Sequence, residues 1–186
     1  MGDFPRYNMP APPILTPWSP DSLGLTSSPA ATAMGTLFSL ASVAWPTNNL
    51  ALFYPFNLYD WATAYQLLFW VGATSSGNID VGIYDSQKNL IVSAGSTAMS
   101  ATVDTVQELN ITDTVLGPGS YLLAVTCSTT GGTTYYNTIN DEIVLSAITI
   151  YQQASALPLP DPCAPVISTS ATPPLIACGI QFRSVF

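Results

Sequence analysis

The fold is decided by residues 74–94, which read TSSGNIDVGIYDSQKNLIVSA. Within residues 79–84, branched apolar side chains alternate with other types, and a period of two residues is typical of a strand with one buried face. Polar, turn-forming residues flank this strand at 74–78 and 85–89. The second turn leads into another apolar run at 90–94. The stretch therefore predicts an antiparallel hairpin.

Similar segments, rich in Thr, Val, Ile and Tyr, recur through residues 36–151, and no window shows sustained helical periodicity. Pro55 favours an edge position or a bulge for its strand. Gly117-Pro118-Gly119 suits a type II turn. We expect an all-β body, a two-sheet antiparallel sandwich of jelly-roll type. The predicted strands are 36–44, 50–58, 63–71, 79–84, 90–94, 103–111, 121–127, 133–138 and 143–151.

Proline-rich segments flank this body at residues 1–35 and 152–186. Proline excludes helices and central strands, yet both segments are too apolar for solvated linkers. They are therefore predicted to be extended arms that lie on a partner, with a tail that never orders as the alternative for residues 1–35. Residues 178–186 look like a short final strand, which either returns to the sandwich or pairs with the exposed edge of a neighbouring chain. The predicted interface side chains are Phe4, Tyr7, Ile14, Leu15, Trp18, Leu23, Ile180 and Phe182.

Charge is scarce: charged residues make up 8% of the chain, hydrophobic residues 48%, and the net charge is −8. Three basic residues cannot neutralise a run of phosphates, which excludes nucleic acid and an anionic membrane surface as partners. A free soluble protein normally carries interspersed charges of both signs. The composition favours a surface covered by neighbouring subunits, with an acidic, Ser/Thr-coated soluble domain as the alternative.

Enzymatic chemistry is not indicated. The chain has no histidine, which removes the commonest general base and metal ligand. A calcium site in the loops is the remaining metal option, but no tight acidic cluster supports one. Asp80 is expected to face solvent, and Asp85 to accept hydrogen bonds within its own turn. Cys163 and Cys178 either form a disulfide or stay reduced and buried together with Cys127. We therefore expect no catalytic residues, no metal and no cofactor.

Aromatic side chains are the best candidates for ligand contacts, because exposed Trp and Tyr serve as platforms for sugars and as anchors of protein interfaces. Trp70 lies in the most apolar segment and is expected in the core. Trp61 stands at an expected strand end, and Tyr135 and Tyr136 follow a Gly-Gly turn. These last three residues are the predicted ligand contacts.

Five segments together resemble a β-sandwich module found in virion proteins of tailed bacteriophages. The resemblance covers roughly residues 50–126, and the flanking arms fall outside it. It implies a structural role on the exterior of a virion, in fibre, spike or head-decoration proteins that are often trimers, and it supplies no catalytic residues. The segments are FYPFNL (53–58), LFWVGAT (68–74), SGNIDVGIYD (76–85), LIVSAGST (90–97) and GPGSYLLA (117–124).

The function that we expect is therefore that of a virion structural protein. The first hypothesis is a capsid decoration (cement) subunit whose arms bridge neighbouring subunits. The alternative is a tail or head fibre component whose sandwich binds a host glycan, although neither repeats nor heptads indicate a shaft. A free carbohydrate-binding module is a third, weaker hypothesis. The expected partners are other virion proteins and further copies of the chain.

Overall fold

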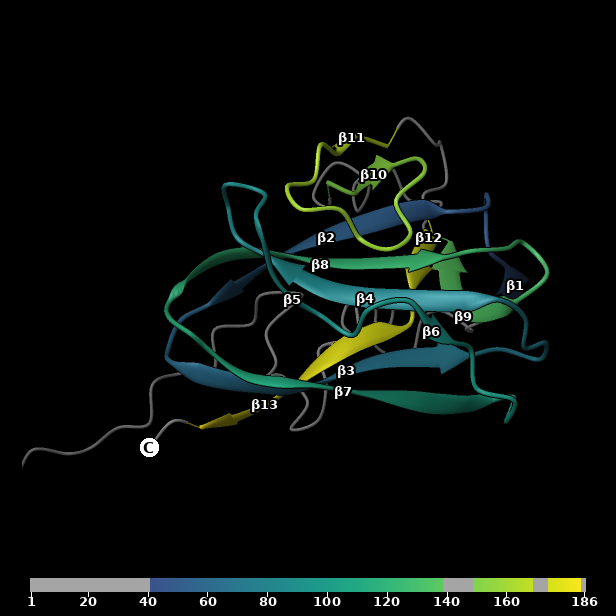
Figure 1. The fold of residues 1–186 in the computed structure, drawn as a ribbon, viewed down its shortest axis with the longest axis horizontal. Coiled ribbons are helices and arrows are strands. Elements are labelled where there is room, and N and C mark those ends of the chain that lie inside the picture. Colours follow the sequence, from purple (N-terminus) through teal and green to yellow (C-terminus); the bar gives the residue numbers. More distant parts are fainter. Residues whose placement is uncertain (1–40, 139–148, 169–173, 185–186) are drawn as a thin grey trace, which may run out of the picture.

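The computed structural model describes residues 41–138, 149–168 and 174–184. In these ranges the chain forms two antiparallel sheets packed face to face, with no helix (Figure 1). The predicted all-β, two-sheet sandwich is confirmed, and its jelly-roll type stays a prediction. No helix in the described ranges has the length and hydropathy needed to cross a membrane.

The first sheet, which we call sheet A, has β3 at its centre, with β7 on one side and β13 on the other. Beyond the end of β3, β9 continues the sheet and pairs with β1 and β12. Its strands are β1 (Ala41–Ala44), β3 (Ala62–Val71), β7 (Thr105–Leu116), β9 (Thr133–Thr138), β12 (Pro174–Ile176) and β13 (Cys178–Ser184).

The second sheet, sheet B, follows the order β11-β10-β2-β8-β4-β5, with β6 also paired to β4. Its long central pairs are β2 with β8 and β8 with β4. Its strands are β2 (Leu50–Leu58), β4 (Asn78–Tyr84), β5 (Leu90–Ser93), β6 (Thr97–Ala98), β8 (Gly119–Cys127), β10 (Tyr151–Gln153) and β11 (Val166–Ile167).

Most predicted strands appear within a few residues of their expected ends, and β2 and β9 match them at both ends. Residues 36–40 and 143–148 of the predicted strands lie outside the described ranges. β10 pairs with β2 only as far as Phe53. Pro55 lies beyond the end of this pairing, so β2 has no neighbour on that side to which the missing backbone N–H would have to donate, and the proline is tolerated.

The prediction of a type II turn was wrong. Such a turn needs a positive φ at its third residue, and neither Gly117 nor Gly119 has one.

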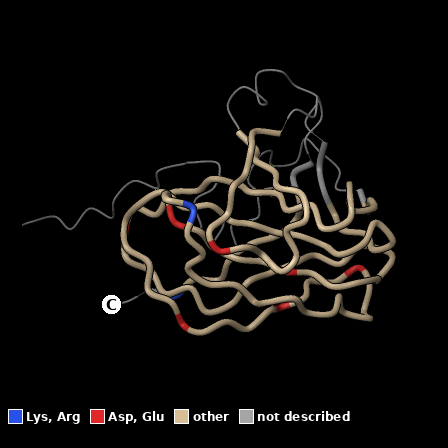
Figure 2. The backbone as a smooth tube through the Cα atoms, turned by 45° about the horizontal axis from the view of Figure 1, so that its top comes forward, with Lys and Arg blue, Asp and Glu red and all other residues tan. Residues whose placement is uncertain are grey.

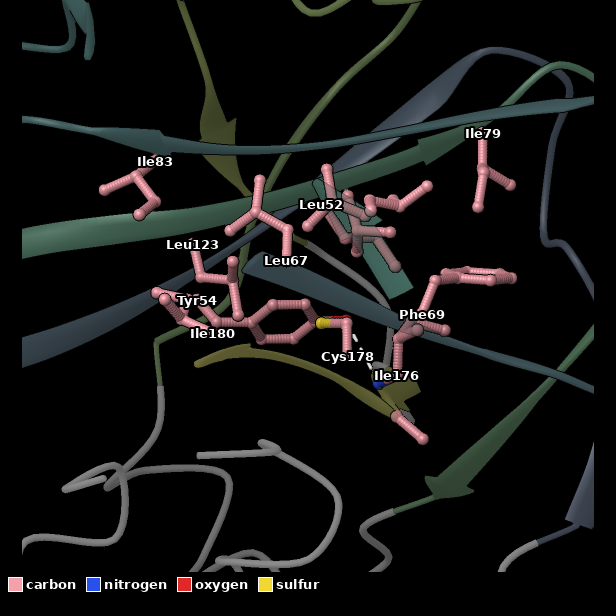
Figure 3. Close-up of a cluster of buried hydrophobic side chains, with 14 of the residues drawn as sticks. Leu52, Tyr54, Leu67, Phe69, Ile79, Ile83, Leu123, Ile176, Cys178 and Ile180 are labelled. Carbon is pink, nitrogen blue, oxygen red and sulfur yellow. Dashed lines mark hydrogen bonds between the residues drawn. The ribbon is translucent and has the colours of Figure 1, made fainter. Parts of the chain in front are cut away.

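The space between the sheets is filled by one continuous apolar cluster, in which side chains from β2, β3, β4, β8 and β13 meet (Figure 3). Leu67 of β3 lies beside Leu52 of sheet B, the ring of Phe69 lies below Ile79, and all four side chains are buried. The hydroxyl of Tyr54 accepts a hydrogen bond from the backbone N–H of Ile176 at 3.2 Å, which ties the C-terminal part of the chain to the middle of the core. Burial raises the pKa of Tyr54 well above its ordinary value.

A second, smaller core lies on the outer face of sheet B, under the segment 154–165. Ala156, Leu159 and Cys163 of this segment are buried against a set of sheet B side chains. Polar contacts fasten it as well: the Tyr84 hydroxyl donates to the carbonyl of Pro160 at 2.6 Å. We call residues 154–165 the cover segment. The sheet B side chains beneath it are Ala51, Phe53, Tyr84 and Ala124.

The final strand returns to its own sandwich, which is the first of the two alternatives drawn from the sequence. β12 pairs with β9 and β13 pairs with β3. The chain therefore lies between β3 and β9, at the point where these two strands diverge, which we call the fork. Ala177 bridges the fork: the N–H of Trp70 donates to its carbonyl at 3.0 Å, and its own N–H donates to the carbonyl of Tyr135 at 2.8 Å. Much of the region 152–186, expected as an arm, therefore belongs to the body.

Candidate functional site

Charged side chains are few among the described residues. Figure 2 shows charged residues at scattered positions along the backbone, with a basic residue beside acidic ones in one loop. No group of three His, Cys, Asp or Glu side chains that could hold a metal ion occurs within the described residues. Arg183 forms an exposed ion pair with Asp113, which contributes little to stability. The described acidic residues are Asp60, Asp80, Asp85, Asp104, Glu108, Asp113 and Asp161, and the described basic residues are Lys88 and Arg183.

Asp80 does not face solvent as expected, since its side chain is fully buried. The alternation along β4 correctly places it on the outer face of sheet B, but the cover segment lies over that face. Its Oδ2 accepts a hydrogen bond from the backbone N–H of Leu159 at 3.0 Å. Desolvation raises the pKa of this carboxyl, and the hydrogen bond from Leu159 offsets part of that effect. Asp80 therefore helps to hold the cover segment on sheet B.

Asp85 behaves as the sequence predicted. Its two carboxylate oxygens accept hydrogen bonds from the backbone N–H and the side-chain amide of Asn89, both at 2.9 Å. These bonds, the side-chain one first, lower the pKa of Asp85. Asp85 thus stabilises the turn between β4 and β5, and its role is structural.

The three cysteines are free and buried, so the alternative of reduced thiols holds. Cys163 lies in the small core under the cover segment, whereas Cys178 lies between the two sheets, where Figure 3 draws it close to Tyr54. Sheet B therefore separates the two thiols that a disulfide would have joined. Burial raises the pKa of Cys127, Cys163 and Cys178, which keeps them as unreactive thiols.

Trp61, one of the predicted ligand contacts, is exposed, with 51% of its surface accessible. Its ring packs over Gly117, where an added Cβ would lie 3.2 Å away. The register of β3 and β7 pairs Thr63 with Val115, which places the exposed Val115 close to Trp61. Tyr59, also 51% exposed, belongs to the same turn. We call Tyr59, Trp61 and Val115 the end patch.

Tyr135 and Tyr136 lie in strand β9 rather than at a loop tip, because β9 begins immediately after the Gly-Gly turn. The ring of Tyr135 packs against Trp70 at a centroid distance of 5.3 Å, and its hydroxyl donates to Oδ1 of Asp104 at 2.8 Å. That hydrogen bond raises the pKa of Tyr135. The backbone of Tyr136 pairs with Ala41 and with β12.

Two of the predicted interface residues fall inside the sandwich. Ile180 is 1% exposed and lies in the inter-sheet core, and Phe182 is half-buried against it. Ile180 is therefore covered within its own sandwich, whereas part of the Phe182 side chain stays accessible. The remaining candidates, Phe4, Tyr7, Ile14, Leu15, Trp18 and Leu23, lie outside the described residues.

A groove that sequence reasoning missed lies on the outer face of sheet B, with a volume of about 310 Å³. Its floor is the cross-strand pair Pro55 and Leu122. No local pattern could have located it, because its lining comes from five separate parts of the chain. We call it the outer groove, and it is lined by Pro55, Ser86, Lys88, Ser120, Tyr121, Leu122, Tyr151 and Pro165.

Comparisons of this chain with protein-family models, with curated proteins and with solved structures found no significant match.

Proposed function

We propose that this protein is a structural subunit on the exterior of a virion, most simply a capsid decoration or cement subunit that acts as a homo-oligomer, with a trimer as the first arrangement to test. The observation that carries the proposal is a surface with few charges and several exposed apolar side chains. Such surfaces are typical of protein interfaces. The most exposed are Tyr59, Trp61, Val103, Val106, Val115, Val166 and Ile167.

In this proposal the sandwich is a rigid body, and the N-terminal segment attaches it to neighbouring subunits. The C-terminal cover segment is fastened to its own sheet B by buried contacts and hydrogen bonds, so it is not available to bridge subunits. Residues 1–35, with seven prolines and several large apolar side chains, keep the bridging role. Ordering a segment that is already extended costs less conformational entropy than ordering a flexible one.

The test of this proposal is the position of the protein on particles that contain it. Antibodies raised against the sandwich should label many sites over the shell. Particles assembled with a chain that lacks residues 1–35 should lose the protein or become less stable to heat and chelators. Labelling confined to a few sites at the tail, or full particle stability after the deletion, would contradict a cementing role.

A glycan-binding fibre component is the second candidate, and the exposed Trp61 is the observation that favours it. An indole ring open to solvent at the end of a sandwich can stack on a sugar ring. Saturable binding of the protein to host polysaccharide, lost in Trp61→Ala and kept in Val106→Ala, would support this candidate. Val106 is also exposed but lies toward the opposite end of β7.

A further inference from the structure

The outer groove exists because sheet B narrows there. β10 pairs with β2 only through Phe53, and Pro55 lies just beyond that point, facing Leu122 across the β2–β8 pair. Tyr151 and Pro165 line the groove where β10 and β11 begin. The result is an open channel with an apolar floor of a pyrrolidine ring and a leucine side chain.

The lining of this groove matches the chemistry of a proline-rich ligand. Grooves lined by aromatic rings bind peptides in polyproline II conformation, in which the ligand's pyrrolidine rings pack on those side chains. Tyr151 supplies such a ring on this face and is half-buried. Tyr121 also lines the groove, but its own ring stacks on Phe56 in the inter-sheet core. Ser86 and Lys88, which are exposed, supply polar groups at the edge formed by the β4–β5 turn.

The chain itself contains ligands of this kind. Residues 10–13 read PAPP and residues 17–20 read PWSP, so each has prolines three residues apart. Three residues complete one turn of a polyproline II helix, about 9 Å in length, and both prolines of each motif therefore lie on the same face. Asp21 follows the second motif directly.

We propose that the outer groove binds residues 10–21 of a second copy of this chain in polyproline II conformation, with Lys88 facing Asp21. The inference rests on the proposed function, since it names the contact by which one subunit holds the next.

The charge of the groove and the length of the chain between Asp21 and the sandwich both agree with residues 10–21 as the ligand. Of the two basic side chains among the described residues, Arg183 is paired with Asp113, so Lys88 is the cation that an incoming carboxylate would meet. The 20 residues from Asp21 to Ala41 can extend over roughly 65 Å. That length is sufficient to reach a neighbouring sandwich.

The experiment is cross-linking between two full-length variants. One carries Ser86→Cys at the edge of the groove, and the other carries Ala11→Cys and a mass tag. The native cysteines are buried, so a short bismaleimide reacts with the introduced thiols. Mixing the two should give a cross-linked heterodimer. The matched control replaces Ser86→Cys with Ser76→Cys, an exposed serine outside the groove and near the opposite end of β4, and should give none.

Two further variants make the test specific. Lys88→Glu in the groove partner, or Pro10→Ala with Pro13→Ala in the tagged partner, should abolish the cross-link. Lys88 is exposed, so its substitution removes no buried side chain, and an unchanged urea midpoint should accompany it. A yield no greater than that of the Ser76→Cys control overturns the inference. So does a cross-link that forms only within one chain when Ser86→Cys and Ala11→Cys are combined.

Sedimentation of the full-length protein separates this failure from failure of the proposed function. Oligomers that depend on residues 1–35 without a groove cross-link would mean that the segment docks elsewhere on a neighbour. A protein that stays monomeric, on its own and on particles, with or without residues 1–35 would contradict both proposals.

Discussion

The two sheets of this sandwich differ in what covers their outer faces. The outer face of sheet B carries its own small core under the cover segment, where Phe53 and Ala124 are fully buried. The outer face of β7 in sheet A instead exposes Val106, together with the charged Glu108 and polar Asn110. The comparison teaches that apolar side chains serve two purposes in this protein. Those under the cover segment stabilise the fold, and those on β7 are exposed to solvent, where we propose that they contact other molecules.

The largest effect should follow from truncating the cover segment where it is most deeply packed. Leu159→Ala removes a side chain that is 5% exposed, and we expect a loss of about 2–5 kcal/mol in the free energy of unfolding. Urea denaturation would measure it. The matched control is Val115→Ala, since Val115 is 55% exposed, and its cost should be below about 0.5 kcal/mol. Equal losses in the free energy of unfolding for the two variants would contradict the view that the outer face of sheet B is a core and that of β7 is not.

Gly82→Ala tests how closely the cover segment approaches sheet B. A Cβ at residue 82 would lie 2.9 Å from Leu159 Cδ1 and 3.1 Å from the carbonyl oxygen of Val92. We expect a cost of about 1–3 kcal/mol from overpacking. Combining it with Leu159→Ala should cost less than the sum of the two single changes, because the shorter side chain makes room. Strict additivity in denaturation experiments would show that the two residues do not touch.

Asp80→Asn should have a smaller effect with a characteristic pH dependence. Burial raises the folded-state pKa of Asp80, so the folded protein holds its proton to a higher pH than the unfolded chain does. Stability is therefore lost as the pH rises from the ordinary pKa of Asp through the raised value. The asparagine variant lacks this loss, so its stability relative to the native protein should increase over that interval. Thermal unfolding at several pH values would reveal it.

The control for this experiment is Glu108→Gln, which changes an exposed carboxyl on β7. Its unfolding temperature should follow that of the native protein across the same interval. An Asp80→Asn variant with no such gain would mean that solvent reaches the carboxyl beneath the cover segment.

The smallest effect on folding is expected for Trp61→Ala in the end patch. Half of the indole surface is already exposed, so the free energy of unfolding should change by less than about 1 kcal/mol. The same variant should nevertheless weaken the association of the protein with its partner, measured by co-sedimentation with particles. A large loss of stability with unchanged association would assign Trp61 to the fold instead.

The sequence alone predicted the body well where local patterns act. The strict alternation at residues 79–84 and the apolar runs of β2 and β3 indicated both the strands and the fold class. Asp85 was placed correctly because an Asx turn involves only residues close in sequence. The exposure of Trp61 could also be anticipated, since it stands at a strand end.

The sequence did not reveal which faces would be covered. Proline content made residues 152–186 resemble the N-terminal segment, yet the tertiary structure lays one part of them on sheet B and inserts another between β3 and β9. These contacts join residues far apart in the chain, such as Leu159 with Asp80, and no periodicity encodes them.

What the sequence determined by itself is therefore the kind of structure: a two-sheet β-sandwich with few charges and no histidine. Only the tertiary structure decided that Asp80 is buried, that Ile180 belongs to the core and that a groove opens beside Pro55. The physical reason is that strand formation follows from side-chain alternation within a few residues. Burial depends on which distant segment comes to lie on each face.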